Sequence, residues 1–410
     1  MEPRRRIAYL LTAYPTITET FVEGEFRALA ERGMAIDLYA TRNFRELVGE
    51  DPDPDRGLSI NRLPYFWSLE VWLASGAFLL LRPWRTVGTF LRVVAGNAAS
   101  PHFLMQTVAL FPKTLAFARR MERRGTAHVH GTWGHYPATC AYVAARLLKV
   151  PFSFTAHAGL DVYADQTFLK QKISSARFVL TCMDGNRRLL AELAPEASDR
   201  IHTVYHGVTL SAIPPAGTMP RAEPPEIVSA GRLVPEKGFV DLIAACGLLR
   251  RRGIVFRLRI FGDGPERSRL EDAIRSENLG DAVILEGFAP HRRILEAAAR
   301  ATVVALASFE LPQKYLDGMA NVLVEAMACG TAVVSTSYSG SRELLLDGKA
   351  GLLVPQREPA RLAEALETLL TRPEVREELR RSGSRRALAD FVRERNVGRI
   401  EALFQESLGG

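Results

Sequence analysis

Cysteine is scarce in this chain of 410 residues, and long uncharged apolar runs are missing. The four cysteines are scattered, with neither the spacing of a metal or redox pair nor the density of a disulfide scaffold. The nearest candidate for a spanning helix, residues 66–81, is interrupted by Glu70 and falls short of the roughly 18 residues required. Basic residues precede the apolar run 7–11, but Pro15 follows without a small-residue cleavage site. These absences predict a protein of the reducing cytoplasm.

Motifs of two other protein classes are also missing. Residues 11–15, Leu-Thr-Ala-Tyr-Pro, follow the first predicted strand, where a dinucleotide-binding protein carries G-x-G-x-x-G. This counts against an NAD-dependent oxidoreductase, which is one alternative function. No cysteine or glutamate lies at ligand spacing from the histidines, so we expect no metal site. No nucleic-acid recognition module is visible, and nucleic acid is not an expected partner.

Positive charge is concentrated in the first half of the chain. The whole chain carries +7, and residues 56–124 alone hold ten Lys and Arg against two acidic residues. Trp67, Trp72, Trp84 and other apolar side chains are interleaved with these cations. Such a region suits an anionic membrane surface or an anionic acceptor. It is equally consistent with helices that pack on a core and turn arginine toward solvent.

Short β-rich apolar runs alternate with helical patterns along the whole chain. This alternation is typical of doubly wound parallel sheets, and the length suggests two or three domains. The proline-dense stretch around residues 214–225 reads as an interdomain linker. We therefore predict two Rossmann-like domains facing a central cleft, with ligands at the carboxyl ends of the strands. The predicted parts are residues 1–210, a linker 211–225, residues 226–385, and a C-terminal helical segment 386–410 that returns to the first domain.

Three loops of the second half could bind a nucleotide. Arg232 and Lys237 flank a predicted strand-to-helix turn, where the helix N-terminus favours anions. Gly262 and Gly264 form a tight turn after the next strand. Two carboxylates eight positions apart, Asp317 and Glu325, fit a loop acid followed by an acid inside a helix that grips a diol. An apolar core helix with one stray acid explains the last pattern as well.

Four of the eight histidines lie between positions 128 and 157, at two consecutive predicted strand ends. They are His128, His130, His135 and His157. A sugar or phosphate pocket is the favoured interpretation, although a lone histidine is usually structural.

At these loops the sequence resembles the family 4 glycosyltransferases, which are retaining enzymes of the GT-B fold that use nucleotide-sugar donors. The resemblance covers nearly the whole chain and is strongest from Ile227 to Val354. The first half is similar to the subgroup that builds bacterial exopolysaccharides and other surface glycans, through residues 14–25 and the strand around His130. The sequence departs from the family at Asp317, where the pattern has Glu, and at Thr132, where another His is frequent.

The resemblance implies a role for each matched residue. His157, His130 and Asp317 become the catalytic candidates, with the two histidines positioning donor sugar and acceptor. Glu19, Thr20 and Trp133 fall on the acceptor side. The donor-binding set is Arg232, Lys237, Gly262, Gly264, Gly318, Asn321, Val322, Leu323 and Glu325.

The implied reaction is sugar transfer with retention of configuration and without metal or other cofactor. Arg232, Lys237 and helix N-termini would stabilise the leaving diphosphate, and the strand-end loops carry no Asp-x-Asp motif. The implied partners are a nucleotide-diphosphate sugar and a glycan or lipid-linked oligosaccharide. An anionic membrane could contact residues 56–124, which would make the protein peripheral on the inner face of the cytoplasmic membrane. A nucleotide- or sugar-binding protein without turnover is the second alternative function.

Overall fold

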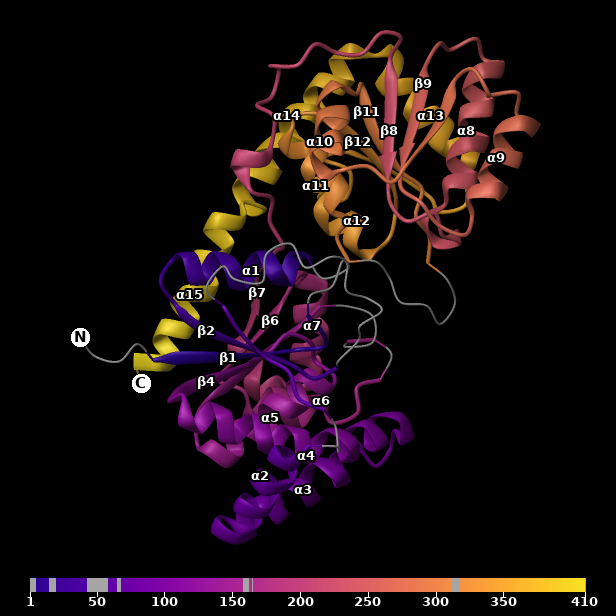
Figure 1. Cartoon of the computed structure of the whole chain (residues 1–410). Helices are drawn as coiled ribbons and strands as arrows, with labels where there is room; N and C mark the ends of the chain where they lie inside the picture. Colours follow the sequence, from indigo (N-terminus) through magenta and orange to yellow (C-terminus); the bar gives the residue numbers. More distant parts are fainter. Residues whose placement is uncertain are drawn as a thin grey trace. The chain divides into compact units, whose positions relative to one another are not determined.

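The computed structural model describes residues 5–14, 20–42, 58–64, 68–157, 162–163, 165–310 and 318–409. The chain forms two units, each built on its own parallel sheet (Figure 1). The first unit comprises residues 1–204 and 397–410, and the second comprises residues 205–396. Among the described helices, none combines the length and the apolar character needed to cross a membrane.

The first unit contains a seven-stranded sheet in the order β3-β2-β1-β4-β5-β6-β7. Its described pairings are all parallel, with Ile7 opposite Ile36 in β1 and β2. The strands are β1 (Arg6–Leu11), β2 (Ala35–Ala40), β3 (Ser59–Asn61), β4 (Thr126–Gly131), β5 (Phe152–Ala156), β6 (Phe178–Thr181) and β7 (Ile201–Thr203). The helices are α1 (Thr20–Glu31), α2 (Leu69–Leu81), α3 (Pro83–Asn97), α4 (Pro101–Arg123), α5 (Tyr136–Leu148), α6 (Leu169–Ser175), α7 (Asp184–Leu193) and, for its larger part, α15 (Arg393–Gly409).

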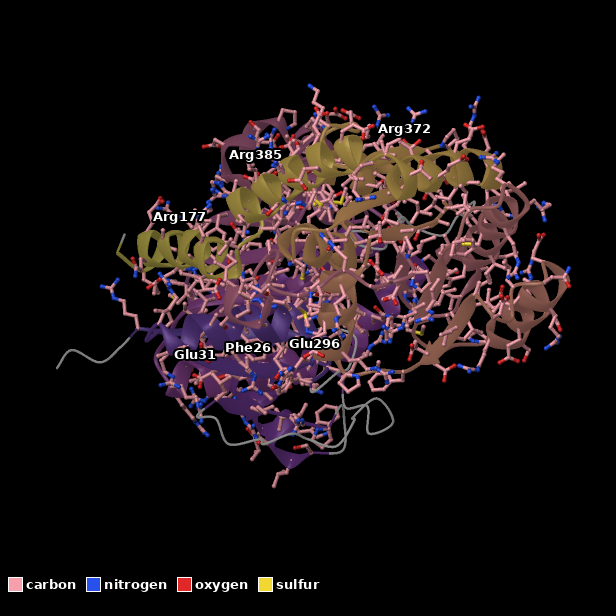
Figure 2. The ribbon with its side chains drawn as sticks, turned by 90° about the horizontal axis from the view of Figure 1, so that it is seen from above. Phe26, Glu31, Arg177, Glu296, Arg372 and Arg385 are labelled. Atoms are coloured by element: carbon pink, nitrogen blue, oxygen red, sulfur yellow. The ribbon has the colours of Figure 1, made fainter. Side chains whose placement is uncertain are left out.

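Helices cover both faces of this sheet. One core joins the sheet to α2, α4 and α5 through side chains such as Phe78, Leu115 and Tyr142. The other core joins it to α1 and α15 through Phe26 and Phe404. On α1, Phe26 is fully buried while Glu31 faces solvent, and both are labelled in Figure 2. The strands are continuous apolar runs because both of their faces are buried.

The second unit contains a six-stranded parallel sheet in the order β10-β9-β8-β11-β12-β13. Helices α8, α9 and α13 share one core with the sheet, and α10, α11 and α14 share the other. The strands are β8 (Glu226–Ala230), β9 (Arg257–Phe261), β10 (Val283–Gly287), β11 (Val303–Leu306), β12 (Ala332–Thr336) and β13 (Leu352–Val354). The helices are α8 (Phe239–Arg251), α9 (Arg267–Ser276), α10 (His291–Arg300), α11 (Asn321–Ala328), α12 (Ser339–Leu344), α13 (Pro359–Thr371) and α14 (Pro373–Asp390).

The unit boundaries differ from the predicted ones at both crossings. The stretch 211–225 belongs to the second unit rather than standing between two domains. The Arg221 guanidinium donates to the backbone carbonyls of Ala299, Ala301 and Gly330, which fixes this stretch on the second unit. The chain passes between the units after Val204, and it returns to the first unit at Val397 rather than at residue 386. Proline content marked an irregular segment but could not show which unit its side chains bind.

Candidate functional site

Three loops of the second unit lie together because their strands are neighbours. Gly231, Gly262 and Gly287 stand at the carboxyl ends of β8, β9 and β10, which are adjacent in the sheet. The Gly231 amide donates to the carbonyl of Phe261 over 3.0 Å, and the Gly262 amide donates to the carbonyl of Gly287 over 2.8 Å. These backbone bonds join the three loops into one edge, where ligands of doubly wound sheets bind.

Two glycines of this edge are required by close backbone contact. Gly262 has φ +133°, and a Cβ built on it would lie 1.9 Å from the Gly231 carbonyl oxygen. Gly238 has φ +65°, and its Cβ would lie 1.9 Å from the Ala307 carbonyl oxygen. Gly264 follows the same pattern against the Leu233 carbonyl, at 2.5 Å. These glycines therefore shape the edge through the backbone, and any contact they make with a ligand is a backbone contact.

Two cations stand where a helix of this edge begins. Arg232 is exposed and stands two positions after the end of β8, and Lys237 ends a short 3-10 turn, Pro235–Lys237, just before α8. Gly238 links that turn to α8 in a left-handed conformation, so Lys237 stays beside the helix start. Free amides at a helix N-terminus attract anions, and two flanking cations add to that attraction. The arrangement can hold a phosphate group.

Helix α11, in the same unit, carries several of the predicted donor-binding residues, and their side chains differ in exposure. Asn321 and Val322 form its first turn, and Asn321 is exposed. Gly318 precedes the helix, and its carbonyl oxygen would lie 2.8 Å from a Cβ on Gly340, at the start of α12. Leu323 is an exception, because its side chain is fully buried and its amide donates to the Ala320 carbonyl. The side chain of Leu323 therefore packs in the core, and its assignment to the donor-binding set remains a prediction.

Glu325 lies one turn further along α11 and has a partner that the sequence did not indicate. Its Oε1 lies 2.9 Å from Nε2 of His291, the first residue of α10. The carboxylate is only 14% exposed, whereas the imidazole is 62% exposed. The hydrogen bond to Glu325 raises the pKa of His291 above its ordinary value. His291 fixes one oxygen of Glu325 and leaves the other available for a ligand hydroxyl.

In the first unit, His130 lies in the core rather than at a surface. Its ring is fully buried, and its Nδ1 and Nε2 lie 2.8 Å from the Ser153 hydroxyl and 3.1 Å from the Thr155 hydroxyl. The ring packs on Tyr9 and Phe404, and burial lowers its pKa well below the ordinary value. We therefore interpret His130 as a structural residue, because both nitrogens are engaged and no ring surface is open to a substrate.

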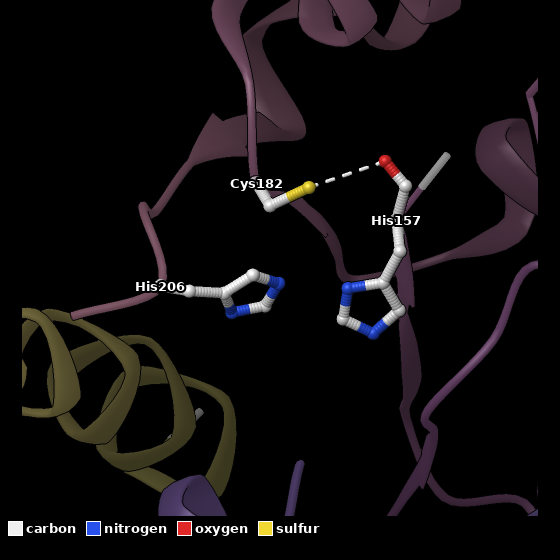
Figure 3. A group of neighbouring side chains, drawn as sticks. All are labelled: His157, Cys182 and His206. Atoms are coloured by element: carbon white, nitrogen blue, oxygen red, sulfur yellow. Dashed lines mark hydrogen bonds between the residues drawn. The ribbon is translucent and has the colours of Figure 1, made fainter. Parts of the chain in front are cut away.

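His157 lies at the carboxyl end of β5, among aromatic side chains. Its backbone carbonyl accepts a hydrogen bond from the Cys182 thiol over 3.2 Å (Figure 3) and another from the Asn186 amide. Its ring lies 4.6 Å from that of Trp133 and 5.0 Å from that of Phe21, between centroids. The structure thus brings the predicted residues His157 and Trp133 together, and adds Phe21, which lies in the resembling stretch 14–25 but is not among the predicted site residues.

Three predicted residues are not placed by this geometry. Asp317 and Glu19 lie outside the described residues, and Thr20 is described only as the first residue of α1. Their proposed roles remain predictions.

Comparisons with known proteins agree with the two-sheet architecture. Residues 217–386 match the family described as glycosyl transferases group 1. WcaL of Escherichia coli K12, named as a colanic acid biosynthesis glycosyltransferase, is 38% identical over 168 residues, which cover 41% of each chain. The counterpart from Salmonella typhimurium is matched over 45% of its length, so the chain spans less than half of these relatives.

Solved structures match over nearly the whole chain. Sucrose-phosphate synthase from Thermosynechococcus elongatus superposes with a TM-score of 0.72 at 20% identity, covering 99% of this chain and 100% of that one. HepE of Anabaena, in complex with UDP, superposes with a TM-score of 0.70 at 14% identity, covering 98% and 100%. At such identities the likeness establishes the fold alone. The chain therefore has the GT-B architecture, and its residues 217–386 match the model of the glycosyl transferases group 1.

Proposed function

We propose that this protein transfers a sugar from a nucleotide-diphosphate donor to a glycan or lipid-linked acceptor in bacterial surface polysaccharide synthesis. The observation that carries the proposal is the edge of the second sheet. There Arg232 and Lys237 flank the start of α8 within a domain of the glycosyltransferase group 1 family. The relative WcaL, named for colanic acid biosynthesis, supports the choice of pathway.

The donor would occupy the second unit. Arg232, Lys237 and the free amides at the start of α8 would receive its diphosphate. Glu325 would accept hydrogen bonds from the two ribose hydroxyls through the oxygen that His291 leaves available. The HepE neighbour was solved with UDP, which supports a nucleoside diphosphate as the ligand class.

The reaction would retain the configuration of the transferred sugar and need no metal. As the glycosidic bond to the diphosphate breaks, negative charge grows on the leaving oxygen, and Arg232 and Lys237 would stabilise it. The acceptor hydroxyl would attack from the same face, and the departing phosphate would take its proton. His157, held by its carbonyl bonds to Cys182 and Asn186, would position the acceptor beside Trp133.

The acceptor proposal rests on the first unit. The excess of cations in residues 56–124 suits a lipid-linked oligosaccharide at an anionic membrane. Peripheral association with the inner face of the cytoplasmic membrane follows from the same charge.

A thermal-shift panel with UDP, GDP, ADP, NAD and their sugar conjugates, all with EDTA present, tests the donor site. We expect one nucleoside diphosphate to raise the melting temperature, and Glu325→Ala and Lys237→Ala to abolish that shift. Glu296→Ala is the matched control, because Glu296 is 41% exposed on α10 and, among the described residues, pairs with Arg292 one turn away. A shift with NAD alone would overturn the proposal. A shift without any transfer to added acceptors would favour the binding protein without turnover.

The stereochemistry needs a separate measurement. Proton NMR of the anomeric centre during transfer or donor hydrolysis should show the product first in the configuration of the donor. Appearance of the opposite anomer first, or strict dependence of turnover on a divalent cation, would refute the mechanism.

A further inference from the structure

Helix α2 of the first unit is apolar on both of its sides. Val71, Ala74 and Phe78 are buried against the core. Leu73 and Leu80, on the opposite side, are 64% and 82% exposed. A helix that is apolar all round is normally buried on all sides, so its outer face calls for a nonaqueous neighbour.

The exposure is greatest where α2 meets α3. We call residues 79–85 the apolar corner. Within it Leu79, Leu80, Leu81 and Trp84 are 48%, 82%, 72% and 89% exposed, and Trp84 is the most exposed large apolar side chain among the described residues. Four such side chains within six consecutive positions form a continuous patch, which in a soluble monomer usually marks an interaction site.

The apolar corner is fixed to the end of α5. The Arg82 and Arg85 guanidinium groups donate to the Leu147 carbonyl over 3.1 and 3.4 Å. Helix α5 runs from the carboxyl end of β4 back to the start of β5. The corner therefore lies at the edge where the strands begin, opposite the edge that holds His157.

A basic cavity lies at the same end of α5, lined by residues on both sides of Leu147 in the sequence. It measures about 410 Å³ and is lined by Arg146, Lys149, Arg177 and Arg200, with no acidic residue in its lining. Arg177, labelled in Figure 2, forms an ion pair with Glu406 at 3.2 Å, and Arg200 lies 3.9 Å from Asp199. Arg146 and Lys149 have no acidic partner among the described residues, so the cavity keeps an excess of positive charge.

We propose that the first unit docks on an anionic lipid bilayer, with the apolar corner inserted among the acyl chains and the basic cavity receiving a lipid phosphate. Trp and Arg at the ends of apolar helices suit the interface between hydrocarbon and headgroups. A second copy of the chain fits less well, because a symmetric contact through this surface would place the same unpaired cations opposite one another. The proposal deepens the peripheral association proposed above and rests on it for its biological setting.

Co-sedimentation with vesicles tests this docking without any donor or acceptor. The purified full chain is mixed with vesicles of phosphatidylglycerol and phosphatidylethanolamine, and separately with vesicles of phosphatidylcholine alone. We expect stronger binding to the anionic vesicles. Leu80→Glu combined with Trp84→Glu should reduce that binding at least tenfold. Arg146→Glu combined with Lys149→Glu should remove the preference for anionic lipid.

The matched control is Val255→Glu combined with Leu388→Glu. These side chains are 70% and 42% exposed in the second unit, and their substitution adds the same charge. All altered side chains are solvent-exposed, so circular dichroism and thermal melting should confirm unchanged folding.

Three outcomes overturn the proposal. The first is that the wild-type chain binds neither vesicle, and the second is that the control pair loses binding as strongly as the corner pair. The third is that the wild-type chain is a dimer in sedimentation equilibrium and the corner variants dissociate it. Vesicle binding without turnover on any donor would refute the proposed function and leave this inference standing. Turnover without vesicle binding would do the reverse.

Discussion

Replacing Gly262 with alanine should damage the donor site through the backbone. The new Cβ would lie 1.9 Å from the Gly231 carbonyl oxygen, whereas real Cβ contacts essentially never fall below 3.0 Å. The loops after β8 and β9 must therefore separate by about 1 Å, which overpacking data put at roughly 1–3 kcal/mol. The backbone angle φ of +133° adds strain of about 1–3 kcal/mol for a residue with a side chain. We expect Gly262→Ala to lower the free energy of unfolding by about 2–6 kcal/mol.

Substitutions at two other glycines distinguish the steric cost of the new Cβ from the cost of the backbone conformation. Gly253 has φ +74° but open space around its Cβ position, so Gly253→Ala should show only the conformational cost, about 1 kcal/mol. Gly280 has neither a left-handed φ nor a neighbour within 4 Å, so Gly280→Ala should change the free energy of unfolding by less than about 0.5 kcal/mol.

Urea denaturation followed by circular dichroism suits this series, because all four tryptophans lie in the first unit and would not report on the second. The thermal shift produced by UDP adds a functional measurement. We expect Gly262→Ala to lose it and both control variants to keep it. If Gly262→Ala were no less stable than Gly253→Ala, the close approach of the two loops would carry no energetic weight and the reasoning would be refuted.

Three further predictions follow from polar groups of both units. Burial lowers the pKa of His128 and His135 to about 3, so their contribution to stability is complete above pH 6.5 and is lost as the pH falls. Urea titrations should show that each of these histidines lowers the free energy of unfolding by about 1.4 kcal/mol per pH unit below pH 6.5. The dependence on pH should be shallower in His128→Gln. Arg221→Ala should lower the free energy of unfolding by about 2 kcal/mol in the same assay, because it leaves several backbone carbonyls without a donor. The pKa of His291 is raised, so its ion pair with Glu325 is present below that pKa and weakens as the pH rises through it. Titration calorimetry should therefore show that the affinity of the wild-type chain for the donor falls about threefold above this pKa. The affinity of His291→Gln should not change over the same pH range.

Much of the fold could be predicted because buried parallel strands leave a strong signal. Strands β6 (Phe178–Thr181) and β8 (Glu226–Ala230) are short apolar runs of this kind, and they belong to the alternation that predicted doubly wound sheets. Strand β3, with only three residues, gave no comparable signal. Helix α2 was ambiguous for a physical reason, since its exposed and buried sides are both apolar and no polar stripe reveals its period.

Residues of the candidate site could be predicted only where their place along a single strand or helix is enough to identify them. His157 and His130 have the same sequence setting, near the carboxyl end of a strand, and both are buried, yet they have different neighbours. His157 packs against Trp133 and Phe21, whereas His130 packs against Phe404 of α15, about 270 positions further along the chain. Sequence spacing carries no information about such a contact.

The pair His291 and Glu325 is a second case in which the sequence does not show which residues meet in the fold. Glu325 could be singled out because an acid among Val, Ala and Met in a short helix needs a partner. The partner is set by topology, since α10 and α11 pack in the same core on one face of the sheet and the start of α10 meets the middle of α11. The two residues are 34 positions apart, with strand β11 between them, and no periodic pattern in the sequence predicts that they meet. A carboxylate inside a helix is therefore visible in a sequence, but its orientation, on which ligand selectivity depends, is decided by whichever helix packs beside it.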